Sequence, residues 1–368
     1  MCGCGSVPRP PGHRSRPPAG APMTGGPRRI LIVRLSAIGD VIVTTPVSRA
    51  LRSAFPEAFL AWVVEPRAAE ILEANPYLDE VIPWDRKKGG LTLGEIRDVT
   101  RVLRSRAFDT VLDFQGLLRS ALVSRLSGAR QVIGNTPARE YADRLYHTRV
   151  AKSQSDPSSR QRCLDLLRPL GVVSEDRRMV VCLTAAHREA GGRLLEEAGV
   201  GEGRGYVCLA PGTTWPQKHW FEDRWAELAR RIRKELELVP VVLGGPGDRE
   251  AAVRISSAAG VPCGDLTGRT SLLEAAAVLK QAAFTVAVDT GLMHLSAAME
   301  TPTVALCGAS WFYGFQDYAR LALVREPLPC SPCLHRPTCG GRYDCMLALT
   351  PRRVLEAALA LWTGTHAG

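Results

Sequence analysis

The chain has 368 residues, of which 45% are hydrophobic and 23% charged, and its formal net charge is +10. These proportions are ordinary for a globular protein, and the length suits two α/β domains better than one. Five of the positive charges are arginines of residues 1–29, so the basic excess elsewhere is modest. That excess is compatible with an anionic substrate or an acidic membrane surface, but no basic stripe with interleaved aromatic residues indicates nucleic-acid binding.

Residues 1–27 are rich in proline, glycine and arginine and lack apolar periodicity, which predicts a disordered N-terminal extension. They contain no apolar stretch typical of a secretory signal, and Met23 is an alternative start to Met1. No segment approaches the roughly 18 apolar residues that a membrane-spanning helix needs. Because the body of the chain carries scattered single cysteines, we expect a reducing, cytoplasmic environment.

The first half of the chain alternates short apolar runs with helical patterns. Predicted strands are 29–35, 59–64, 81–82, 110–114 and 131–133, and predicted helices are 41–55, 68–73, 96–103, a helix opening at 115–120 and one at 164–170. This alternation predicts a doubly wound parallel sheet in an N-terminal Rossmann-like domain, residues 28–176.

The second half repeats the alternation after a polar junction. Predicted strands are 206–209, 239–243, 284–288 and, as the last strand, 303–306, and predicted helices are 222–236, 271–280 and 292–299. We therefore expect a second Rossmann-like domain at residues 177–350. Residues 351–368 are expected to form a final helix and tail.

Two of the predicted strands end in a turn that carries a carboxylate at the start of a helix. Asp40 follows the first strand, and Asp289 with Thr290 follows strand 284–288. Open α/β sheets bind ligands at the carboxyl ends of their strands, and the free amides of a helix N-terminus favour a phosphate. Each carboxylate could instead cap its helix, and His294 by itself could be an ordinary buried histidine.

Other strand ends carry polar groups of matching chemistry. The loop after strand 206–209 contains Thr213, Thr214 and Lys218, which suit a diphosphate, and Asp248 could accept from a ribose hydroxyl. The polar residues at strand ends of the first half are Arg34, Asp40, Asp113, Gln115, Arg119, Arg139 and Glu140. Their arginines favour a substrate with phosphates or carboxylates. Neither G-x-G-x-x-G nor the G-x-x-x-x-G-K-[ST] phosphate loop occurs.

Four segments carry a family resemblance. They are Arg34-Leu35-Ser36-Ala37-Ile38-Gly39-Asp40-Val41, Asp113-x-Gln115-Gly116-x-x-Arg119-Ser120, Pro211-Gly212-Thr213-Thr214 with Lys218-His219-Trp220, and Val288-Asp289-Thr290-Gly291-x-x-His294. In this order and spacing they resemble the bacterial ADP-heptose:lipopolysaccharide heptosyltransferases, glycosyltransferase family 9, over roughly residues 28–325. The resemblance implies the α/β GT-B fold, in which two Rossmann-like domains face each other across a cleft. In this fold the C-terminal helix, expected here within residues 351–368, usually crosses back to the first domain.

The resemblance also implies an activity and its partners. It is the inverting, metal-independent transfer of heptose from ADP-heptose to the lipopolysaccharide inner core, Kdo-lipid A or heptosyl-Kdo-lipid A. The enzyme would be a monomer without cofactor, peripheral to the cytoplasmic face of the inner membrane, with no nucleic-acid partner. The absence of any Asp-x-Asp pair disfavours the metal-using glycosyltransferases.

Residue roles follow from the same resemblance. Asp40 matches the general base that takes the acceptor hydroxyl proton. The donor-side residues are Thr213, Thr214, Lys218, Asp248, Asp289, Thr290, Gly291 and His294. The acceptor-side residues are Arg34, Gln115, Arg119 and Arg139.

A cysteine-rich loop at 330–345 departs from the commoner family pattern. It contains Cys330, Cys333, Cys339 and Cys345, and only the first pair has the tight spacing of zinc sites. We expect no catalytic metal, while a structural zinc, a disulfide and reduced thiols all remain open for this loop.

Competing functions come from other classes. Within the family, another nucleotide sugar or acceptor is an alternative, and the sequence does not distinguish the first-heptose from the second-heptose acceptor. A GT-B nucleotide-sugar epimerase has the same two-domain build. A nicotinamide-dependent oxidoreductase is disfavoured by the missing G-x-G-x-x-G. A non-catalytic lipid- or nucleic-acid-binding module would depend on the basic charge alone.

Overall fold

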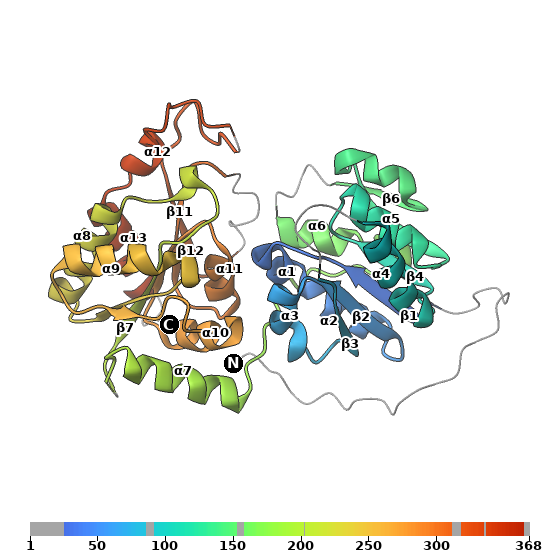
Figure 1. Ribbon diagram of the computed structural model, residues 1–368, viewed down its shortest axis with the longest axis horizontal. Helices are drawn as coiled ribbons and strands as arrows, with labels where there is room; N and C mark the ends of the chain where they lie inside the picture. The colour runs from blue at the N-terminus through green and yellow to red at the C-terminus, as the bar shows by residue number, and fades with distance from the viewer. Residues whose placement is uncertain are drawn as a thin grey trace. The chain divides into compact units, whose positions relative to one another are not determined.

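The computed structural model describes residues 26–85, 92–152, 158–201, 203–310, 318–334 and 336–363 (Figure 1). Its contacts divide the chain into two compact units, Met1–Cys182 and Leu183–Gly368. Each unit contains one six-stranded sheet in which all strand pairs are parallel. Residues 1–25 of the predicted disordered extension lie outside the described residues. Within the described part of the chain, no helix is long and apolar enough to cross a membrane.

The sheet of the first unit has the strand order β3-β2-β1-β4-β5-β6. Its strands are β1 Arg29–Val33, β2 Phe59–Val64, β3 Glu80–Pro83, β4 Thr110–Asp113, β5 Gln131–Thr136 and β6 Thr148–Ala151. The order reverses between β1 and β4, which are paired. In a doubly wound sheet this reversal is the point where ligands bind, outside the carboxyl ends of the strands. Strand β6 was not predicted.

Helices connect these strands. They are α1 Ile38–Thr44, α2 Pro46–Ala54, α3 Pro66–Glu73, α4 Leu93–Ser105, α5 Leu118–Leu126 and α6 Ser159–Asp165, with 3₁₀ turns η1 Arg139–Leu145 and η2 Arg168–Leu170. The prediction of one helix over 41–55 is wrong, because Pro46 starts a new helix. Proline cannot donate a backbone N–H to continue the preceding helix, but its fixed φ suits the first turn of a new helix.

The second unit repeats the arrangement with the order β12-β11-β10-β7-β8-β9. Its strands are β7 Tyr206–Ala210, β8 Val239–Val242, β9 Gly264–Asp265, β10 Thr285–Val288, β11 Thr303–Cys307 and β12 Leu321–Arg325. The order reverses between β7 and β10, which pair directly. The prediction that 303–306 is the last strand is wrong, because β12 pairs with β11 and extends the sheet.

Helices cover both faces of the second sheet. They are α7 Ala185–Glu197, α8 Glu222–Glu235, α9 Arg249–Ala259, α10 Leu272–Gln281, α11 Gly291–Ala298, α12 Asp344–Leu347 and α13 Pro351–Thr363, with 3₁₀ turns η3 Pro216–Lys218 and η4 Pro246–Asp248. In Figure 1, α8, α9 and α13 lie on one face and α10 and α11 on the other. Helix α7 was not predicted because its sequence is polar, and it packs against α10.

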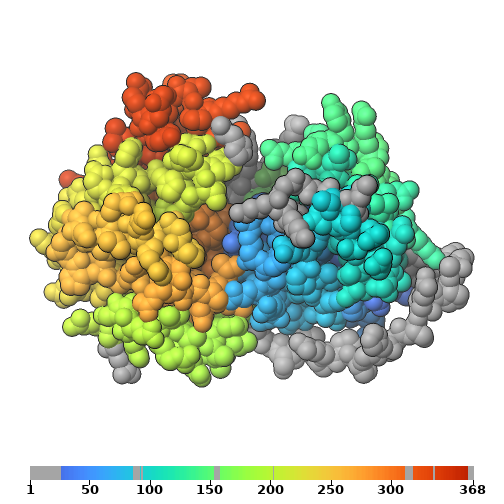
Figure 2. All heavy atoms as spheres, in the orientation of Figure 1, coloured from blue at the N-terminus to red at the C-terminus, as the bar shows by residue number. Residues whose placement is uncertain are grey.

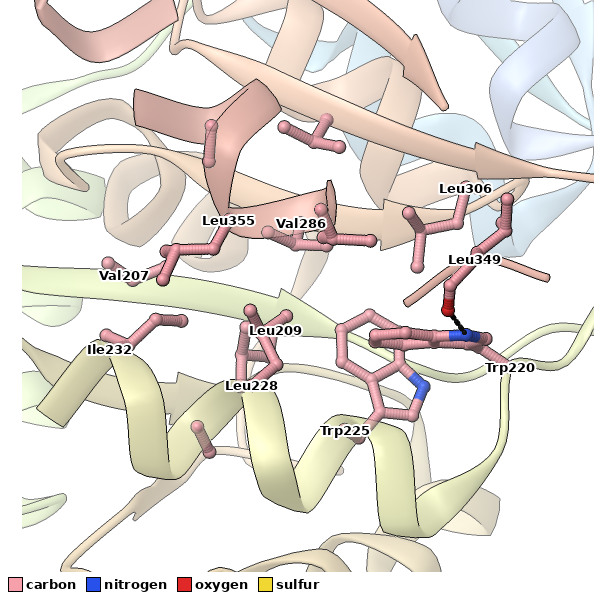
Figure 3. Close-up of a cluster of buried hydrophobic side chains, with 14 of the residues drawn as sticks. Val207, Leu209, Trp220, Trp225, Leu228, Ile232, Val286, Leu306, Leu349 and Leu355 are labelled. Atoms are coloured by element: carbon pink, nitrogen blue, oxygen red, sulfur yellow. Dashed lines mark hydrogen bonds between the residues drawn. The ribbon is translucent and has the colours of Figure 1, made fainter. Parts of the chain in front are cut away.

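The core of the second unit explains the course of its last helix. Trp220 and Trp225 pack edge to face, with ring centroids 5.0 Å apart, and the Trp220 indole donates to the carbonyl of Leu349 at 3.0 Å (Figure 3). Val354 and Leu355 of α13 are buried in the same cluster. The apolar face of α13 is therefore used within the second unit. Residues 364–368, the end of the segment predicted to form the final helix and tail, lie outside the described residues.

Candidate functional site

Asp40 lies in the first turn of α1, directly beyond the carboxyl end of β1. Its carboxylate is 2.7 Å from Nη2 of Arg34 and accepts from the amide of Ala37 at 3.3 Å. The side chain is still 54% exposed, whereas that of Arg34 is only 17% exposed. Asp40 thus makes one cap-like hydrogen bond and keeps a large part of its carboxylate open to a ligand.

A buried carboxylate organises the turn after β4, the strand next to β1. Asp113 is fully buried and accepts from the amides of Gln115 and Gly116, the hydroxyl of Ser120 and the phenol of Tyr146, at 2.9 to 3.2 Å. Burial raises the pKa of Asp113, although these four donors act in the opposite direction. Gly116 has φ +66°, a conformation that favours glycine.

This turn contacts the loop that leads to Asp40. Oε1 of Gln115 accepts from the amides of Leu35 and Ser36 at 2.9 and 3.2 Å. Nη1 of Arg34 donates to the carbonyl of Phe114. The oxygen of Gln115 and the guanidinium of Arg34, both predicted to face the acceptor, are therefore engaged with the protein itself.

The other two predicted acceptor residues lie beyond β4 and β5. Arg119 is half-buried in α5, and Arg139 is exposed at the start of η1. The two elements are joined by a hydrogen bond from the Leu118 amide to Glu140, 3.0 Å long. Their surface also carries two exposed apolar side chains, Leu118 and Tyr141, which are 47% and 72% exposed.

The second unit places Asp289 at the carboxyl end of β10, where Lys218 meets it. Nζ of Lys218 and the hydroxyl of Ser310 lie 2.7 and 2.5 Å from the same carboxylate oxygen of Asp289. Thr213 donates to the backbone carbonyl of Asp289 at 3.2 Å. Thr290 is the N-cap residue of α11 but makes no side-chain capping bond. The capping alternative is thus wrong for Asp289 and Thr290.

The surroundings of Asp289 favour its charged form. Burial acts to raise the pKa of Asp289, but the ammonium of Lys218, the Ser310 hydroxyl and His294 outweigh it and hold the pKa below its ordinary value. Lys218 also lies 4.0 Å from the centroid of the Trp215 ring. Nδ1 of His294 is 3.2 Å from the hydroxyl of Tyr318. The Lys218 ammonium is held in place at the carboxyl ends of the strands by Asp289.

Ser310 was not assigned a role from the sequence. It follows β11, the neighbour of β10, so its position at the same edge depends on strand order. The remaining predicted donor residues lie at this edge too: Thr214 is exposed after β7, and Gly291 opens α11.

Asp248 occupies a cradle formed by two glycines. Its carboxylate accepts from the amide of Gly245 at 2.8 Å. A side chain at Gly212 or at Gly244 would collide with the Asp248 carboxylate. The loops after β7 and β8 thus approach this acid closely, and the absence of a side chain at Gly212 and Gly244 makes room for its carboxylate.

The cysteine-rich loop is attached to the same strand ends. The hydroxyl of Ser331 donates to the carbonyl of Gly308, and the Leu334 amide donates to the carbonyl of Ala309 at 2.8 Å. The side-chain amide of Gln217 donates to the Leu334 carbonyl at 2.6 Å. Figure 2 shows the segment around α12, in red, projecting from the surface of the second unit. This loop therefore supports the segment that carries Ser310.

The thiols of this loop are free. Cys330 is exposed, Cys333 and Cys339 are half-buried, and Cys345 is buried. Among the residues that the structure describes, which exclude His335, no three His, Cys, Asp or Glu side chains are grouped so as to hold a metal ion.

Comparison with known proteins gives the family of this chain. Residues 96–343 match the model of glycosyltransferase family 9 (heptosyltransferase). The chain is 35% identical to lipopolysaccharide heptosyltransferase 1 of Pseudomonas aeruginosa, over 90% of this chain and 98% of that protein. The chain belongs to glycosyltransferase family 9. The resemblance inferred from the four sequence segments is confirmed.

Solved structures of family members share the fold. The glycosyltransferase family 9 structure from Veillonella parvula superposes with a TM-score of 0.80, at 21% identity, covering 92% of this chain and 97% of that one. The E. coli heptosyltransferase WaaC with ADP-2-deoxy-2-fluoro heptose gives 0.66 at 26% identity, covering 89% and 98%. This family 9 protein is a glycosyltransferase with the GT-B fold, which confirms the predicted fold class and enzyme class.

Proposed function

We propose that this family 9 enzyme transfers heptose from ADP-heptose to the lipopolysaccharide inner core, with inversion and without a metal ion. The proposal rests on the side chains found in each sheet at the point where the strand order reverses. A half-exposed carboxylate, Asp40, lies at the reversal of one sheet, and a fixed cation, Lys218, lies at that of the other. The names of the P. aeruginosa and E. coli relatives support the sugar and the acceptor.

The proposed reaction is a single displacement. Asp40 takes the proton of the acceptor hydroxyl as that oxygen forms a bond to the anomeric carbon of the heptose. The bond from this carbon to the diphosphate oxygen breaks at the same time, and ADP leaves. Attack from the face opposite the leaving group inverts the anomeric centre. Protonated Asp40 then returns its proton to water.

The proposed donor site is the edge of the second sheet. The ammonium of Lys218 and the amides at the start of α11, at Thr290 and Gly291, would hold the diphosphate, with the hydroxyls of Thr213 and Thr214. Asp289 would orient Lys218, and His294 would border the site. Asp248 would accept from a ribose hydroxyl; Gly212 and Gly244, in the loops after β7 and β8, lie close to its carboxylate.

The proposed acceptor side is the surface of α5 and η1. Arg119 and Arg139 would pair with the carboxylates or phosphates of the acceptor, because a guanidinium binds such groups in a bidentate manner. Arg34 would act through Asp40, to which it is bonded.

The first test is a transfer assay with ADP-heptose and deacylated core acceptors of increasing length. We expect the Kdo-terminated acceptor to be used, because relatives named heptosyltransferase 1 are 30% to 35% identical and those named heptosyltransferase 2 are 25% identical. Product only on the heptosylated acceptor would make it a second-heptose enzyme. A chelator should leave the rate unchanged, and a strict requirement for an added divalent ion would contradict the cationic site.

A second test concerns the membrane that carries the acceptor. We propose that the surface of Leu118, Tyr141, Arg139 and Arg144 lies against the anionic cytoplasmic face of the membrane, since apolar side chains beside arginines suit an interface. The double variant Leu118→Ser, Tyr141→Ser should bind vesicles of phosphatidylcholine and phosphatidylglycerol roughly tenfold more weakly in cosedimentation. Val173→Ser, which changes another exposed apolar side chain of this unit, is the control. Equal binding of all three proteins would contradict the docking surface.

A further inference from the structure

We propose that Gln115 is a positioning residue for Asp40, and that it acts through the backbone of residues 35 and 36. The family resemblance predicts instead that Gln115 contacts the acceptor. The inference rests on the proposed role of Asp40 as the general base, and it assigns a different task to the neighbouring turn of β4.

The turn after β4 reaches Asp40 by two routes. In the first, the side-chain oxygen of Gln115 accepts hydrogen bonds from the amides of Leu35 and Ser36, which begin the loop leading into α1. In the second, the backbone carbonyl of Phe114 accepts from Nη1 of the Arg34 guanidinium, and Nη2 of the same group is paired with the Asp40 carboxylate. One turn therefore fixes both the chain that carries the acid and the side chain that orients it.

The loop is held from its other side as well. The indole of Trp62 donates to the Arg34 carbonyl at 3.1 Å, and the Glu65 amide donates to the Leu35 carbonyl at 3.0 Å. These two donors come from β2 and the segment after it, so Gln115 supplies the opposing contact from β4. Loss of its oxygen would leave the amides of Leu35 and Ser36 without that acceptor, and the turn after β4 would then hold the loop only through the Arg34 guanidinium.

Gln115 is itself held by a buried network. The amides of Gln115 and Gly116 bind one oxygen of Asp113, and Ser120 and Tyr146 bind the other. The ring of Tyr146 packs where a side chain at residue 134 would stand, and that position is Gly134. The Gln115 side chain therefore starts from a backbone that the core determines.

Catalysis by a general base is sensitive to such positioning. A base must reach the proton within hydrogen-bond distance, and a displacement of about 1 Å can cost roughly a hundredfold in rate. We expect Gln115→Met, which keeps the length of the side chain and removes its oxygen, to lower kcat at least tenfold. The KM for ADP-heptose should stay unchanged, because the proposed donor residues all belong to the second unit.

A conservative variant separates positioning from general damage. Gln115→Glu keeps an oxygen that accepts from both amides, so its kcat should recover at high pH. The added negative charge near Asp40 favours the protonated form of that acid, so the acidic limb of the kcat profile should move to higher pH. The control is Gln131→Met, the same replacement at the amino end of β5, which should behave as wild type.

Three outcomes would overturn the inference. They are a wild-type kcat for Gln115→Met, a raised acceptor KM with unchanged kcat, and a loss of thermal stability with unchanged kcat in the folded protein. The second would return Gln115 to the acceptor site. A different result, wild-type turnover of Asp40→Asn, would overturn the proposed function, so the two failures are distinguishable.

Discussion

Asp40→Asn is expected to lower kcat by roughly 10² to 10⁴, while ADP binds as tightly as to the wild-type protein. Asparagine has the shape of aspartate and can still accept from the Ala37 amide, so the local fold should persist. It cannot take a proton from the acceptor hydroxyl. The measurement is the initial rate of heptose transfer at saturating donor and acceptor, with ADP affinity determined by calorimetry.

The matched control for this prediction is Asp98→Asn. Asp98 is an exposed carboxylate of α4 in the same unit, so its loss changes the net charge equally without touching α1. Its kcat should equal that of the wild type. If Asp40→Asn turned over at the wild-type rate, another group would have to act as the base.

Lys218→Met is expected to lower kcat/KM for ADP-heptose by roughly 10² to 10³, the usual cost of removing one preorganised charge from a transition state. The ammonium is the cation that meets Asp289 at the strand ends, and in the proposed reaction it stabilises the leaving diphosphate. ADP binding should weaken as well. Lys234→Met, at an exposed position in the last turn of α8, is the control and should leave both values unchanged.

The same variant has a consequence for stability that depends on pH. The folded-state pKa of Asp289 is lowered, so its ion pair stabilises the protein above the unfolded-state pKa and is lost as pH falls through the folded-state value. Without Lys218, burial raises the pKa of Asp289. The loss of thermal stability in Lys218→Met should therefore be larger at neutral than at acidic pH. An equal loss at both, or unimpaired transfer, would contradict the assigned role of the pair.

Local sequence patterns were sufficient to predict most of the helices and strands. The strand prediction over 59–64 is confirmed residue for residue, because β-branched and aromatic residues are confined there between turn-forming segments. Predictions failed where tertiary contacts compensate for a weak pattern. Strand β12 is only half-buried along most of its length and forms because β11 offers it a free edge.

The candidate site likewise has features that follow from the sequence and contacts that only the tertiary structure shows. The sequence alone determined the two Rossmann-like sheets, the acids at their strand ends and the membership in glycosyltransferase family 9, since these depend on residue types and spacings along the chain. Only the tertiary structure decided that Gln115 binds the loop before Asp40 and that Ser310 binds Asp289. Those contacts join residues 80 and 21 positions apart, respectively. They follow from the order of strands in each sheet, which no local pattern encodes.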